Sequence, residues 1–144
     1  MNNNTYKHTD FSGDFISLCD CTVSRLGYQD GMLTLELDEG FWLKPVHHAN
    51  RTEKSIRTGK AAVHYNSASA PVAYLFKKGL FGKTSKKELT PAQLGALITD
   101  SSTKLEIIGQ YPTDNGILIK CWAKDKKVTE CHIALTPVSK TYYW

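Results

Sequence analysis

The sequence predicts a β-rich α+β fold: an antiparallel, strongly curved sheet or barrel-like sandwich of seven to eight strands, with one short helix packed on it. Three observations carry this prediction. Apolar and polar residues alternate over several short runs. The dipeptides Asp30-Gly31 and Asn115-Gly116 separate such runs, which indicates antiparallel hairpins. A capping motif at Thr90 marks the start of a single helix.

The length of 144 residues indicates one domain, which we expect over residues 11–144, after a flexible polar tail over residues 1–10. Hydrophobic residues make up 41% and charged residues 22%, so the chain can bury a core of ordinary size. The tail lacks the apolar stretch of a signal peptide, and no apolar run reaches the ~18–20 residues of a membrane helix. We therefore expect a cytoplasmic protein that does not enter a membrane.

The first half of the chain reads as short strands. Phe11–Leu18 is expected to be an approach strand or a short turn, and Phe41–Leu43 a brief apolar run. Between them, Cys21–Tyr28 and Met32–Leu37 form a hairpin across Asp30-Gly31, with the leucines of the second strand pointing inward.

The segment Val46–Gly59 has little periodicity and is expected to be a long loop. Its adjacent histidines, His47 and His48, would point apart in an extended segment, and no further ligands for a metal can be identified. Two more strands, Lys60–Asn66 and Val72–Lys77, follow this loop.

The segment from Lys77 to Lys87 is strongly basic. Its Gly82-Lys83-Thr84 resembles part of a phosphate-binding loop, but Lys77 stands where that pattern requires its first glycine. An exposed basic loop is the better interpretation, and it would steer an acidic partner or nucleic acid electrostatically. The candidate residues of this loop are Lys77, Lys78, Lys83, Lys86 and Lys87.

The helix has the clearest local signals. Thr90 is the expected N-cap, Pro91 suits the first helical position, and Gln93 completes a capping box. Leu89 and Leu94 are spaced as a hydrophobic staple. One apolar face follows at helical spacing: Leu94, Leu97 and Ile98.

The last forty residues read as a meander of three strands, Lys104–Tyr111, Gly116–Ala123 and Val128–Leu135, closed by Thr141–Trp144. A long loop over Pro112–Gly116 keeps the apolar side of the first two strands consistent. A second turn centred on Lys126 places Cys121 opposite Cys131 and Ile119 opposite Ile133. One side then forms the core: Leu105, Ile107, Tyr111, Ile117, Ile119, Cys121, Cys131, Ile133 and Leu135.

The same register defines the other side of the meander, where Trp122 lies among charged residues. The candidate partner-binding residues there are Glu106, Ile108, Lys120, Trp122, Glu130 and His132. Three interpretations stay open: a solvated face with cross-strand ion pairs, a face partly covered by a loop or a terminus, and a recognition surface, since tryptophan is enriched at interface hot spots.

The four cysteines are expected to be free thiols that behave as small buried hydrophobes. The spacing of Cys19 and Cys21 does not suit a zinc knuckle, so a four-cysteine zinc site is disfavoured. Under oxidising conditions Cys121 and Cys131 would be the pair to form a disulfide.

These residues favour a non-catalytic binding protein that acts on a macromolecular partner, as small bacterial immunity proteins and phage-encoded inhibitors do. We expect a protein partner first, with nucleic acid as a second option through the basic loop; a homo-oligomer stays open, and no cofactor or metal is indicated. The alternative is a small-ligand carrier with a pocket lined by Trp42, Tyr65, Tyr74 and the aromatic residues at the end of the chain, Tyr142, Tyr143 and Trp144. A hydrolase or transferase would need His132, Glu130 and Lys120 to supply a base and a charge stabiliser, and Cys19 or Cys21 as a nucleophile.

Overall fold

The structure, a computed structural model, describes residues 6–10, 16–45 and 50–144. Within these ranges fourteen strands form three antiparallel sheets, accompanied by one α-helix, α1 (Pro91–Asp100), and one 3-10 turn, η1 (Leu80–Gly82). The β-rich α+β class with a single helix is thereby confirmed. Among the residues that the structure describes, no helix is long and apolar enough to cross a membrane.

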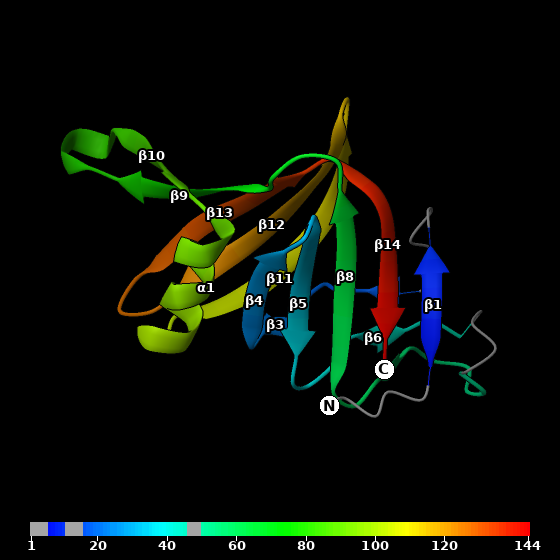
Figure 1. The fold of residues 1–144 in the computed structure, drawn as a ribbon. Coiled ribbons are helices and arrows are strands. Elements are labelled where there is room, and N and C mark those ends of the chain that lie inside the picture. The colour runs from blue at the N-terminus through cyan, green and yellow to red at the C-terminus, as the bar shows by residue number, and fades with distance from the viewer. Residues whose placement is uncertain (1–5, 11–15, 46–49) are drawn as a thin grey trace.

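The first sheet has five strands in the order β1-β14-β8-β5-β4 (Figure 1). Their bounds are β1 (Lys7–Asp10), β14 (Pro137–Tyr143), β8 (Ala61–Ser67), β5 (Met32–Leu37) and β4 (Arg25–Gln29). The hairpin β4–β5 turns at Asp30-Gly31 as predicted, with Gln29 opposite Met32. Both turn residues have positive φ (53° and 77°), which is what a two-residue turn of this handedness requires.

The second sheet has six strands in the order β10-β9-β13-β12-β11-β3. Their bounds are β10 (Thr84–Leu89), β9 (Val72–Lys78), β13 (Val128–Leu135), β12 (Gly116–Lys124), β11 (Lys104–Thr113) and β3 (Thr22–Val23). A third, small sheet contains β2 (Ile16–Ser17), β6 (Trp42–Leu43) and β7 (Ile56–Arg57).

The expected strongly curved sheet or barrel-like sandwich is not what the structure shows: within the described ranges none of the three sheets closes or curls strongly. The predicted strand Cys21–Tyr28 breaks at Ser24, so that β3 joins β11 while β4 joins β5. A second change of sheet occurs at Thr136, between β13 and β14. The chain thus divides its strands between sheets rather than extending one sheet until it closes.

The described part of the expected polar tail is a strand. Residues 7–10 form β1, which pairs with β14, and the backbone of Tyr6 exchanges hydrogen bonds with that of Trp144. The two rings also stack, with their centroids 5.4 Å apart. Strand β14 is longer than the expected Thr141–Trp144, and β1 covers its otherwise free edge. Residues 1–5 and the predicted sites at His47 and His48 lie outside the described residues.

The register of the meander was predicted correctly for β12 and β13, where Cys121 pairs with Cys131. In β11 the prediction fails after Ile107, because a β-bulge shifts the register by one residue and the hairpin ends in a tight turn with Thr113 opposite Gly116. The predicted long loop over 112–116 is therefore wrong. The shift also moves Tyr111, expected in the core, to an exposed position.

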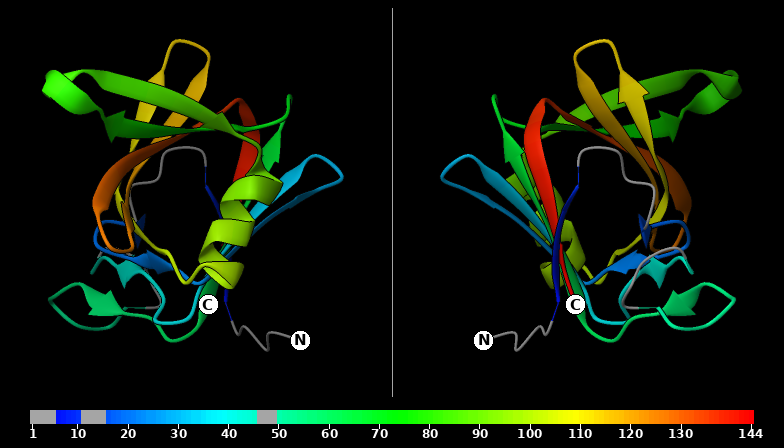
Figure 2. Two further views of the ribbon diagram at one scale, coloured as in Figure 1. Left: turned by 90° about the vertical axis from the view of Figure 1, so that its left-hand side faces the viewer. Right: turned by 90° about the vertical axis from the view of Figure 1, so that its right-hand side faces the viewer.

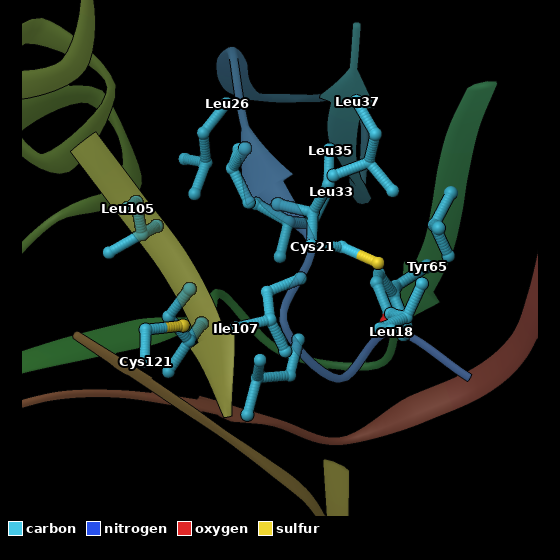
Figure 3. Close-up of a cluster of buried hydrophobic side chains, with 14 of the residues drawn as sticks. Leu18, Cys21, Leu26, Leu33, Leu35, Leu37, Tyr65, Leu105, Ile107 and Cys121 are labelled. Carbon is cyan, nitrogen blue, oxygen red and sulfur yellow. The ribbon is translucent and has the colours of Figure 1, made fainter. Parts of the chain in front are cut away.

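The core lies between the two large sheets (Figure 3). Leu33, Leu35 and Leu37 of β5 face Leu105 and Ile107 of β11 across it, and all five side chains are inaccessible to solvent. Of the predicted meander core, Tyr111 is exposed and Ile117 is half-buried; the other seven residues are buried.

Helix α1 begins as predicted. The Thr90 hydroxyl accepts a hydrogen bond from the Gln93 backbone amide (3.2 Å), and the Gln93 side chain accepts one from the Thr90 amide (2.9 Å). The helix lies against β4, where Gly95 comes so close that a Cβ would lie 2.5 Å from the carbonyl oxygen of Leu26. Gly95 was not recognised from the sequence as part of the buried helix face.

Substitution Gly95→Ala tests this close approach. Alanine favours a helix by about 1 kcal/mol over glycine, but the steric conflict with Leu26 should outweigh this gain and lower the free energy of unfolding by about 1–3 kcal/mol. Urea denaturation measures the change. The control is Gly27→Ala in β4, where a Cβ meets nothing within 4 Å and stability should not fall; equal effects of both variants would contradict the packing.

Candidate functional site

Side chains of the six-stranded sheet that point away from the core form what we call the outer face. Strand pairing aligns one row of this face across five strands: Lys86, Phe76, Glu130, Trp122 and Glu106. The row exists because the neighbouring row is buried and successive strand residues point to opposite sides. Trp122 thus lies between Glu106 and Glu130, as the sequence predicted, and is 38% exposed.

A second row of the outer face contains Lys120, His132, Tyr74 and Glu88. Lys120 was expected to face Ile108, but the bulge in β11 places Gly109 opposite it. Ile108 has no pairing partner at this position and is half-buried. The bulge therefore separates Ile108 from the other five predicted residues.

Local contacts occupy most charges on this face. Lys124 Nζ lies 2.9 Å from Glu106 Oε2, and His132 Nε2 lies 2.8 Å from Glu130 Oε1. The ammonium of Lys86 lies over the Tyr74 ring, 4.4 Å from its centroid. These pairs are partly exposed, and such contacts contribute roughly 1 kcal/mol each, so they leave the face available for other contacts.

The predicted basic loop is instead a hairpin. In the pairing of β9 with β10, Ala73 lies opposite Leu89 at one end and Lys78 lies opposite Thr84 at the other. The 3-10 turn η1 forms the tip of the hairpin. We call residues 76–88 the basic arm; its tip stands clear of the rest of the chain in every view of Figures 1 and 2. All five predicted lysines are exposed: Lys77, Lys78, Lys83, Lys86 and Lys87.

The aromatic residue at the tip of this arm was not predicted from the sequence to be part of the site. Phe81 is 99% exposed and has a positive φ of 64°. The signal was present in the sequence, since Phe81 is the aromatic residue between the lysines of the segment, but a hairpin tip was not expected there.

A groove of about 770 Å³ joins the two predicted surfaces. It is lined by Lys77 and Lys78 of the basic arm and by Asp125, Lys127 and Val128 of the β12–β13 hairpin. Among its remaining lining residues are Phe76, Trp122 and Glu130 of the outer face. The basic arm and the outer face are therefore parts of one surface, which the sequence could not reveal.

The residues proposed for a ligand pocket do not lie together. Tyr65 is fully buried and donates a hydrogen bond to Gln110 Oε1 (2.8 Å), whereas Tyr74 belongs to the outer face. Trp42 lies in the small third sheet beneath the guanidinium of Arg57, 5.1 Å from the ring centroid. These three side chains line no common pocket.

Cys21, Cys121 and Cys131 are buried thiols, as expected, but the expectation is wrong for Cys19, which is exposed. Burial raises the pKa of the Cys21 and Cys121 thiols and raises that of Cys131 to about 12. Even for the exposed Cys19, partial burial and the Asp20 carboxylate raise the pKa. A thiolate nucleophile at neutral pH is not favoured at any of these positions. In the described part of the chain, no group of three or more His, Cys, Asp or Glu residues is arranged to hold a metal ion.

Comparisons with models of protein families, with curated proteins and with solved structures give no match to this chain.

Thiol labelling tests the placement of the cysteines. A water-soluble disulfide reagent should modify only Cys19 in the folded protein, faster at higher pH because the thiolate is the reacting form. The other three thiols should react only when urea unfolds the chain. Cys19→Ser should abolish the rapid phase; a second thiol that reacts as fast in the folded protein would contradict this arrangement.

Proposed function

We propose that this chain is a non-catalytic, cytoplasmic binding protein that acts on a macromolecular partner through the groove formed by the outer face and the basic arm. The observation that carries this proposal is Phe81, which is 99% exposed at the tip of a structured arm. Burying a phenylalanine side chain is worth roughly 1.5–3 kcal/mol, and a partner that covers the tip would recover this energy.

The composition of the groove supports the same proposal. It combines a partly exposed tryptophan with charged residues, and strand pairing fixes the backbone positions of Trp122 and Glu130. Rigid aromatic side chains are the usual anchors of binding surfaces, because little conformational entropy is lost when they are covered. An inhibitor or immunity-type protein acts in this way, by covering a partner without chemistry of its own.

A small-ligand carrier is the second candidate, since the groove volume of about 770 Å³ falls within the range of ligand sites. The groove lies beside exposed lysines of the arm rather than within the core. This openness favours a large partner over an enclosed small molecule.

The test is recovery of cross-linked partners, protein and nucleic acid alike, from cells of the source organism. The wild type should retain a partner. Trp122→Ala and Phe81→Ala should each weaken the affinity for this partner roughly thirty-fold, which corresponds to a hot spot of about 2 kcal/mol. Both variants should unfold at the urea midpoint of the wild type, because neither side chain belongs to the core.

The control is Tyr6→Ala, which removes an exposed aromatic ring next to β1, at the edge of the five-stranded sheet. It should leave the recovery unchanged. A partner retained equally by all variants, or recovery of none, would contradict the proposal.

A further inference from the structure

We infer that the partner is single-stranded nucleic acid, with its phosphates along the basic arm and a base stacked on Trp122. This inference rests on the proposed function and adds the chemical class of the partner. Three features carry it: the excess of uncompensated lysines, the uneven distribution of charge across the groove, and the position of the exposed aromatic rings.

Lysines gather at one end of the six-stranded sheet. The basic arm contributes five, and the adjoining β12–β13 segment contributes Lys124, Lys126 and Lys127. Within the described residues Lys124 pairs with Glu106 and Lys86 lies over Tyr74, while the other six ammonium groups have no ion-pair partner. Protein–protein interfaces are depleted in lysine, whereas phosphate-binding surfaces depend on it.

The carboxylates of the groove have partners within the chain. Asp125 Oδ1 accepts a hydrogen bond from the backbone amide of Lys127 (2.8 Å), and Glu130 is held by His132. Both acids belong to the β12–β13 hairpin, whereas Lys77 and Lys78, which line the same groove, belong to β9. A strand would therefore run with its phosphates on the side of the arm and its bases toward the carboxylates, which can accept hydrogen bonds from N–H groups of the bases, the N3–H of thymine included.

The aromatic rings suit unpaired bases. Trp122 is exposed within the groove, and Phe81 is exposed at the tip of the arm. A groove of about 770 Å³ is the size of a small-ligand site, which a duplex cannot enter but an unpaired base can. The arm contains no Arg, Asn or Gln to read base edges, so binding should tolerate many sequences.

Fluorescence anisotropy with labelled (dT)20 and with a duplex of the same length tests the inference. We expect the single strand to bind more tightly and to quench tryptophan fluorescence. Trp122→Ala and Phe81→Ala should each weaken binding roughly 5- to 150-fold, the effect of losing one stacked base. The triple variant Lys77→Glu, Lys78→Glu, Lys83→Glu should reduce the slope of log K against log salt by about 2.

The matched control reverses three exposed lysines outside this surface, Lys44, Lys54 and Lys60, with the same change in net charge. This control should keep the salt slope of the wild type. Equal affinity for duplex and single strand without dependence on Trp122 would overturn the inference, because it would show adhesion to any polyanion.

Absence of (dT)20 binding would also overturn it, and so would stronger binding to polyglutamate, which would indicate an acidic protein partner. The proposed function is tested separately: it fails if no partner is recovered from cells, or if recovery does not depend on Trp122 and Phe81.

Discussion

A single buried row of side chains sets the geometry on which the rest of the structure depends. Ile107, Cys121, Cys131 and Leu75 lie opposite one another across β11, β12, β13 and β9, and all four are buried. A slip of one residue in any of these pairings would bring charged residues into the core, so burial of this row fixes the register. The next row, from Glu106 through Trp122 to Lys86, then has to point outward.

The groove arises because the sheet continues beyond the core it covers. The β9–β10 hairpin extends past the end of the pairing between β9 and β13, so that residues 77–79 and 81–88 are exposed. Lysines on such an edge strand prevent it from pairing with strands of other chains. This protective role explains some of the lysines of the arm. Edge protection does not require Phe81 at the tip, however, nor lysines in the β12–β13 turn across the groove.

The sequence predicted those elements whose signals are local. The capping box at Thr90, the Asp30-Gly31 turn and the pairing of Cys121 with Cys131 follow from residues within a few positions of each other. The bulge beside Ile108 has no such local signal. It turns Gln110 of β11 toward the hydroxyl of Tyr65, which lies on β8, 45 residues away in the sequence. Likewise, the lysine-rich β10 has a weak strand pattern of its own and is a strand because β9 pairs with it. Most residues of the candidate surface were thus predicted from the sequence. That residues of both predicted surfaces line one groove was not predicted.

Phe81 combines two unfavourable features that nothing else within the described part of the fold offsets. Its backbone lies in the left-handed region, φ 64° and ψ 26°, which costs a residue with a side chain of this size about 1–3 kcal/mol. Its ring is nearly fully exposed, so it gains no packing energy in return. A glycine would fit this backbone better, and the neighbouring Gly82 does adopt positive φ. Because stability within the chain gives no reason for a phenylalanine here, the reason is more reasonably sought in what the tip of the arm contacts.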